Sequence, residues 1–247
     1  MSDKKNKYNT VKKAIEAFIQ LLGEYESYKL SNIEDVEEYN CNIYNEISLQ
    51  HELGLFLREY LEGTWKIFFE KSMYSNQNKK NDKKENTKEN SLWIKKEVDL
   101  VAIKYENGKI SERYAIELKF SKGINARTPE NMFDFIKDIH FMEQVKKYKD
   151  FTKTYNLIIV DSPKYYDKYY YEKKNRPYIY YIFKAESDGK IEIPKIPDND
   201  KKKYIHPTGN SESKEFILEK EYKNICWNPI GNLKKLENYR YLFIEVD

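Results

Sequence analysis

A predicted β-hairpin over residues 96–120 constrains the fold of this chain more than any other segment. Its sequence, KEVDLVAIKYENGKISERYAIELKF, places two alternating stretches on either side of Asn107-Gly108. Alternation is typical of strands because successive side chains point to opposite faces of a sheet. The pair Asn-Gly favours a tight hairpin turn because both residues tolerate positive φ. We therefore expect one face of the first strand to carry Val98, Leu100 and Ala102.

The other face of this predicted hairpin carries three charged residues. Asp99 lies on the first strand, and Glu117 and Lys119 lie on the second. Charges in the middle of apolar strands are costly in a core unless they have partners. Two interpretations follow from the residues alone. Either the two carboxylates hold a divalent cation with the lysine beside it, or the charges pair with one another on the exposed face of a surface hairpin.

The segments around the hairpin predict helices and strands in a regular succession. Helical spacing of apolar residues indicates helices over residues 10–29, 46–62 and 129–149. Short apolar runs indicate strands over residues 64–70 and 155–163. The helix over 46–62 is expected to bury Ile47, Leu49, Leu53, Phe56, Leu57, Tyr60 and Leu61.

The triplet that ends the hairpin resembles the signature of a known enzyme superfamily. Asp99, seventeen intervening residues and then Glu117-Leu118-Lys119 resemble the motif of the PD-(D/E)XK nuclease superfamily, although Val98 stands where the family often has proline. The resemblance implies that Asp99 and Glu117 bind the metal and that Lys119 is catalytic. It also implies that the backbone carbonyl of Leu118 is a further ligand of the metal. The expected cofactor is Mg²⁺, for which Mn²⁺ can substitute.

The same resemblance implies the fold and the domain organisation. We expect an α/β protein with a restriction-endonuclease-like αβββαβ core, in which helices flank a mixed sheet. The core would span 46–162, with a flexible, lysine-rich insertion at 71–92 whose composition is typical of disorder. An N-terminal helical extension would occupy 1–45. A β-rich C-terminal extension, packed on the core, would occupy 163–247 and begin with a strand over 178–186.

Further candidate residues follow from the resemblance and from position. Glu52, in the motif LQHELG, matches a glutamate that superfamily members carry near the active centre; a partly exposed helix acid is the alternative. Lys122 and Arg127 follow the E-x-K strand closely and are predicted to contact phosphates. Gln144 and Tyr148 resemble a Q-x-x-x-Y element of exonuclease-like members, although this spacing is also common by chance on helices.

The composition excludes several classes of protein. Lys and Arg total 44 against 41 Asp and Glu, so affinity for nucleic acid would come from local clusters. The two cysteines, Cys41 and Cys226, form no CxxC pair, which disfavours a zinc site or a disulfide framework. No apolar run approaches the length that spans a bilayer, and the first residues lack the apolar segment of a signal peptide. We therefore expect a cytoplasmic protein without membrane association.

The resemblance to the PD-(D/E)XK superfamily implies a metal-dependent nuclease that hydrolyses DNA phosphodiester bonds. A restriction or bacterial-defence endonuclease is expected by analogy of fold alone. Bacterial proteins with this fold contain segments similar to LQHELG, KKEVDLV, AIELKF and MFDFIKDIHFMEQ. The alternative is a catalytically silent nuclease-like fold that binds nucleic acid or protein. A small-molecule enzyme is disfavoured because no phosphate loop, nucleophile elbow or dinucleotide fingerprint occurs. A homodimer and a protein partner in a defence system both remain open.

Overall fold

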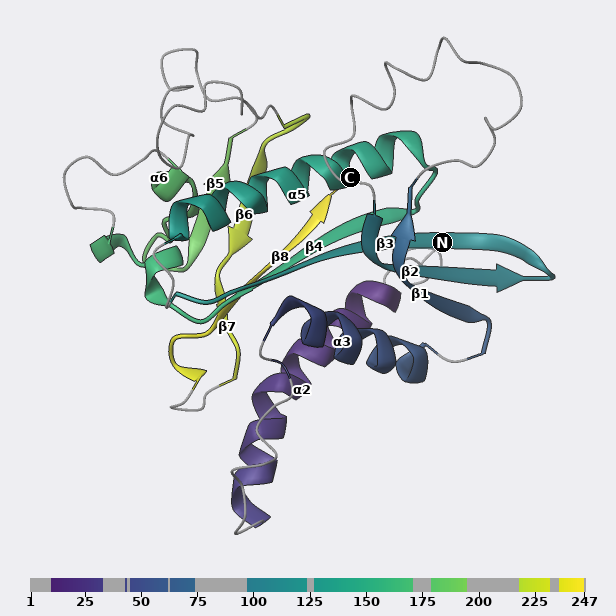
Figure 1. The fold of residues 1–247 in the computed structure, drawn as a ribbon, viewed down its shortest axis with the longest axis horizontal. Helices are drawn as coiled ribbons and strands as arrows, with labels where there is room; N and C mark the ends of the chain where they lie inside the picture. Colours follow the sequence, from purple (N-terminus) through teal and green to yellow (C-terminus); the bar gives the residue numbers. More distant parts are fainter. Residues whose placement is uncertain are drawn as a thin grey trace, which may run out of the picture.

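A mixed six-stranded sheet with helices on both faces forms the centre of the computed structural model (Figure 1). The structure describes residues 10–32, 43, 45–61, 63–73, 97–123, 127–170, 179–194, 218–231 and 236–246, without the side chains of 24–32. The strand order is β1-β2-β3-β4-β8-β7. The strands are β1 (Trp65–Ser72), β2 (Glu97–Glu106), β3 (Lys109–Ser121), β4 (Lys153–Val160), β7 (Asn228–Pro229) and β8 (Arg240–Val246).

The hairpin predicted from the sequence is confirmed as β2 and β3. The two strands pair antiparallel, and the turn residues Asn107 and Gly108 have φ values of 53° and 74°. Both angles lie in the left-handed region that a tight hairpin turn requires. The predicted β-hairpin therefore forms as a local unit of the sheet.

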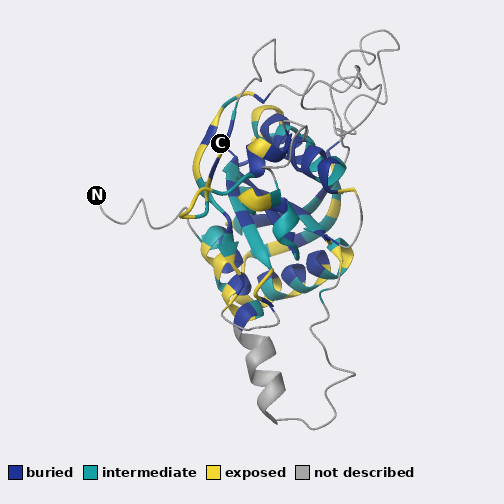
Figure 2. Ribbon diagram, turned by 90° about the vertical axis from the view of Figure 1, so that its left-hand side faces the viewer, coloured by how far each residue is buried: buried dark blue, intermediate teal, exposed yellow. Residues whose placement is uncertain are grey.

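Two helices cover one face of the sheet and a third covers the other. α2 (Thr10–Asn32) and α3 (Glu46–Tyr60) pack below the sheet in Figure 1, and α5 (Thr128–Tyr148) lies above it. Leu100, Leu118 and the inward face of α3 share one apolar cluster, whereas Val101 and α5 share another. Buried residues accordingly concentrate in the sheet and on the helix faces turned toward it (Figure 2).

The connection from β3 to β4 is a crossover through α5. The two strands are parallel, with Glu117 beside Asn156 and Lys119 beside Ile158 in register. Parallel neighbours need a long connection, which α5 supplies. Along the described chain the order α3–β1–β2–β3–α5–β4 therefore follows the predicted succession.

The C-terminal region belongs to the same sheet and adds a smaller one. β8 pairs antiparallel with β4, and β7 pairs with β8. β5 (Lys190–Ile193) and β6 (Tyr222–Cys226) form a separate two-stranded sheet. The β-rich region thus extends the central sheet at the side of β4.

The predicted strand over 178–186 is wrong. The segment contains α6 (Ile179–Phe183), in which Ile179, Tyr180, Ile182 and Phe183 are buried and Tyr181 is 49% exposed. Burial at positions i, i+1, i+3 and i+4 is helical spacing, and a short aromatic run does not distinguish it from a buried strand.

Three smaller predictions also need correction. Ile47 and Tyr60 of α3 are 73% and 47% exposed, because the helix turns other residues toward the sheet. Val98 is buried in the α5 cluster rather than with Leu100, so the alternation breaks at the intervening residue. β1 continues through Ser72, so the predicted insertion at 71–92 starts later; its residues 74–92 lie outside the described part of the chain.

Candidate functional site

Asp99 lies where the two strands of the hairpin separate. Pairing of β2 with β3 runs from the turn to Leu100 opposite Ile116, and Asp99 is the next residue of β2. Its Oδ2 accepts a hydrogen bond from the main-chain nitrogen of Leu118 at 2.7 Å. Its carbonyl oxygen accepts a hydrogen bond from Nε2 of Gln50 on α3 at 2.8 Å. Both the side chain and the backbone of Asp99 are therefore held in place.

Glu117 and Lys119 lie on the sheet face that α5 covers. Glu117 is fully buried, whereas the Lys119 side chain is 20% exposed. The Lys119 ammonium nitrogen lies 3.5 Å from Oδ2 of Asp138 on α5 and 2.8 Å from Oε2 of Glu46 on α3. Carboxylates from two helices thus bracket one lysine of β3, and this restricts the positions that its ammonium group can take.

Three further polar residues, Glu46, Gln50 and Asp138, contact the candidate site residues, and the first two were not predicted. On α3 the buried positions include Leu49, Gln50 and Leu53, and Glu46 precedes them by the helical spacings of three, four and seven residues. That spacing was the available signal for Glu46 and Gln50. A polar residue within the apolar face of α5 was the signal for Asp138, which is 7% exposed.

The register of α3 separates Glu52 from these contacts. An α-helix turns about 100° per residue, so Glu52 lies about 200° around the axis from Gln50. Glu52 is partly exposed, whereas Gln50 is buried and touches the backbone of Asp99. α3 therefore brings Glu46 and Gln50, rather than Glu52, to Lys119 and Asp99, and a role for Glu52 stays a prediction that this register disfavours.

Lys122 and Arg127 lie near the end of β3. Both side chains are exposed, and Arg127 directly precedes α5. The segment after β3 is anchored to the end of β4: the Gly123 nitrogen donates to Oδ1 of Asp161 at 2.6 Å, and the Lys122 carbonyl accepts from the Tyr165 hydroxyl at 3.3 Å. The exposed Lys122 is therefore braced directly after β3, and the exposed Arg127 stands at the start of α5.

Tyr165, whose hydroxyl bonds the Lys122 carbonyl, is fully buried. Its hydroxyl accepts a hydrogen bond from Nδ2 of Asn131 on α5 at 2.8 Å. Burial raises the pKa of the Tyr165 hydroxyl above its ordinary value, and the hydrogen bond from Asn131 opposes that shift. The neutral hydroxyl is thereby kept as a donor to the Lys122 carbonyl.

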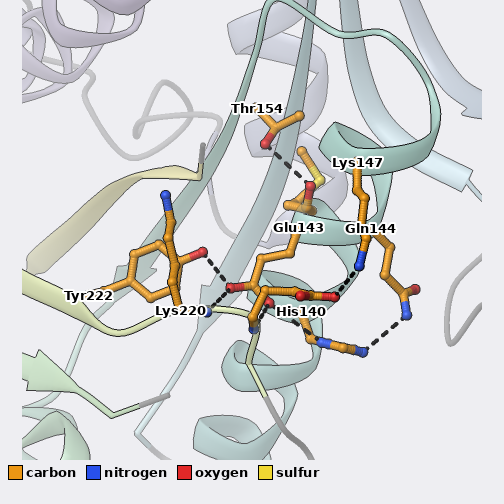
Figure 3. Close-up of polar contacts among 9 residues, drawn as sticks. His140, Glu143, Gln144, Lys147, Thr154, Lys220 and Tyr222 are labelled. Carbon is orange, nitrogen blue, oxygen red and sulfur yellow. Dashed lines mark hydrogen bonds and ion pairs between the residues drawn. The ribbon is translucent and has the colours of Figure 1, made fainter.

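Gln144 and Tyr148 lie on a later part of α5 with different neighbours. Nε2 of Gln144 is 3.0 Å from Nε2 of His140, and Tyr148 is 56% exposed. Figure 3 shows His140 and Gln144 beside Glu143, whose carboxylate accepts the Tyr222 hydroxyl at 2.9 Å. This part of α5 holds the C-terminal segment against the helix, and nucleic-acid contacts by Gln144 and Tyr148 stay predictions.

The donor atoms at the site suit a hard divalent cation. Asp99 and Glu117 supply carboxylates, and Mg²⁺ characteristically uses one or two carboxylates and keeps several waters. Within the described residues, no group of three or more His, Cys, Asp or Glu side chains is arranged to hold a metal ion by itself. Glu117 is fully buried, and buried carboxylates are ordinarily paired with a cation or bound to a metal. The residues therefore fit a metal that completes its shell with water and phosphate oxygens.

Comparisons with protein-family models, with curated proteins and with solved structures found no match. The element order and the contacts of Asp99, Glu117 and Lys119 therefore carry the functional interpretation. No helix in the described ranges combines the length and the apolar character needed to cross a membrane.

Proposed function

We propose that this protein is a divalent-metal-dependent nuclease that hydrolyses DNA. The observation that carries the proposal is the bond from the Leu118 amide to the Asp99 carboxylate. Leu118 lies between Glu117 and Lys119 in the chain, so this bond fixes Asp99 next to the segment that carries both. The order α3–β1–β2–β3–α5–β4 supports a restriction-endonuclease-like core for the same reason, because it puts the three residues in the central strands.

Each residue of the site has a distinct role in this proposal. Asp99 and Glu117, with the Leu118 carbonyl, would hold Mg²⁺ or Mn²⁺, which when bound polarises the phosphate and acidifies a bound water. Lys119 directs its ammonium group at the attacking water or at the negative charge that develops on the phosphate. Glu46 holds Lys119 from the side of α3.

DNA is the proposed substrate because exposed cations border the site. Lys122 and Arg127 would contact backbone phosphates and position the scissile bond without reading sequence. A restriction or defence endonuclease acting in the cytoplasm is the setting that we propose. A nuclease-like binding module is the second candidate, favoured by the near-neutral charge of the chain, a net +3.

The test is a cleavage assay with supercoiled plasmid, linear duplex, single-stranded DNA and RNA in Mg²⁺, Mn²⁺ or EDTA. Wild type should cleave DNA only with a divalent cation. Asp99→Ala and Glu117→Ala should lose cleavage and metal binding, whereas Lys119→Ala should lose cleavage and still bind Mn²⁺. Equal activity of all three variants and wild type would rule out this mechanism. Metal-independent DNA binding without cleavage would favour the binding module.

A further inference from the structure

Asn156 of β4 is a fully buried amide with no hydrogen-bond partner in the described part of the chain. Its exposed fraction is 0%, and neither Oδ1 nor Nδ2 makes a hydrogen bond there. Leaving one buried donor or acceptor unsatisfied costs about 1–3 kcal/mol. A strand position inside an apolar sheet would ordinarily carry valine or isoleucine. The amide therefore calls for a chemical explanation.

The strand register places Asn156 beside Glu117. β3 and β4 are parallel with Glu117 opposite Asn156, and neighbouring strands lie about 4.8 Å apart. Both side chains point to the α5 face, since Thr154 of the same strand bonds the Met142 carbonyl of α5 and Lys119 meets Asp138.

The other lateral neighbour of Asn156 is apolar. On β8 it stands opposite Ile244, which is fully buried. Within its row across the three strands, Glu117 is therefore the polar neighbour of Asn156. Thr154, two residues earlier, has its hydroxyl engaged with the carbonyls of Met142 and Val246. The unpaired amide is thus specific to the position beside Glu117.

We propose that Asn156 is a positioning residue for a divalent cation at Glu117, an inference that rests on the proposed function. With a metal bound, Nδ2 of Asn156 would donate to the Glu117 carboxylate and hold its orientation, and Oδ1 would be free to accept from a water. Groups that orient the ligands of a metal in this way contribute about 10–100-fold to its affinity. The unsatisfied amide therefore destabilises the metal-free protein, and metal binding removes this destabilisation.

The test uses Mn²⁺ as the probe, with calorimetry for affinity and electron paramagnetic resonance for the environment of the bound ion. Asn156→Leu fills the space without polar atoms, and Asn156→Ala leaves a cavity. Both should raise the Kd for Mn²⁺ about tenfold or more and alter the spectrum of bound Mn²⁺. Thr154→Val, on the same strand and face, is the control; it should lower stability but keep the Mn²⁺ affinity and spectrum of wild type.

The outcomes separate this inference from the proposed function. Wild-type Mn²⁺ affinity and spectrum in both Asn156 variants would overturn the role of Asn156, even if the protein cleaves DNA. Weaker Mn²⁺ binding in both variants of a protein that cleaves no nucleic acid would support Asn156 and reject the nuclease. Wild type that binds no Mn²⁺ would reject both. If Asn156→Leu fails to fold, Asn156→Ala decides by the same criteria.

Discussion

Oδ2 of Asp99 accepts a hydrogen bond from the main-chain nitrogen of Leu118 at 2.7 Å, at the end of the paired part of the hairpin. A main-chain carbonyl would ordinarily accept this donor in an antiparallel ladder. Here a carboxylate takes its place, so the strands separate while the buried amide stays satisfied. The same bond anchors the Asp99 carboxylate to the residue between Glu117 and Lys119, so this one side chain has both a structural contact and a proposed role in metal binding.

The first prediction separates these two roles of Asp99. Asp99→Asn keeps an acceptor for the Leu118 amide and removes the charge, so its free energy of unfolding should change by less than about 1 kcal/mol. Asp99→Leu leaves the amide unsatisfied and should cost about 1–3 kcal/mol. Both variants should lose Mn²⁺ binding. Urea denaturation and calorimetry measure the two effects, and equal destabilisation by both variants would contradict the structural role of this hydrogen bond.

The second prediction concerns the buried carboxylate of Glu117. If Glu117 serves a metal rather than the fold, Glu117→Gln should not lower the free energy of unfolding in EDTA by more than about 0.5 kcal/mol, although the side chain is fully buried. Glu112→Gln is the matched control, because this buried carboxylate contacts Lys104 at 3.3 Å and accepts the Tyr114 hydroxyl at 2.6 Å. The control should lose stability. A loss of stability in both variants would show that Glu117 is a structural carboxylate.

The third prediction compares two glutamates of α3. Glu46→Gln weakens the ion pair with Lys119 and should slow cleavage about tenfold, which corresponds to about 1.4 kcal/mol of activation free energy. Glu52→Gln should stay within about twofold of wild type, a change of less than about 0.5 kcal/mol. Single-turnover cleavage in Mg²⁺ measures both rates. A larger loss for Glu52→Gln would restore the original expectation that Glu52 serves the site.

The fourth prediction concerns the two cations beyond β3. Lys122→Ala and Arg127→Ala should each reduce the salt slope of DNA binding by about one, because each removes one phosphate contact. Lys109→Ala, at the turn end of the hairpin, is the control and should leave the slope unchanged. Fluorescence anisotropy in Ca²⁺ over a range of NaCl concentrations measures the slope. Unchanged slopes in all three variants would show that DNA binds at another surface of the protein.

The fifth prediction concerns alkaline stability and Tyr165. Burial raises its folded pKa above the ordinary value of 10.0, so above that pH the unfolded chain releases this proton more readily than the folded protein. The stabilisation from Tyr165 is therefore fully present below pH 10 and is lost as pH rises through the folded pKa. Tyr165→Phe should reduce stability near pH 7 but flatten its decline above pH 10, as urea titrations at each pH would show. If the stability of Tyr165→Phe declines as steeply above pH 10 as that of wild type, other titratable groups cause the decline.

Local patterns were enough to predict much of the core. Alternation and the Asn107-Gly108 turn predicted the hairpin, because strand periodicity and positive φ are properties of adjacent residues. Helical spacing predicted α5 in the same way, and the apolar run at 155–163 predicted β4. The candidate residues Asp99, Glu117 and Lys119 were named from this local arrangement and from the resemblance that their spacing carries.

Only the tertiary structure decided which further residues meet the hairpin. Glu46 reaches Lys119 because of the rotation of α3 about its axis, and Asn156 stands beside Glu117 because of the register between parallel strands far apart in the chain. A short aromatic run at 179–183 became a helix through the side chains that it buries. Periodicity reports how a segment can fold, whereas rotation, register and packing depend on the shape of distant segments, which no local pattern contains.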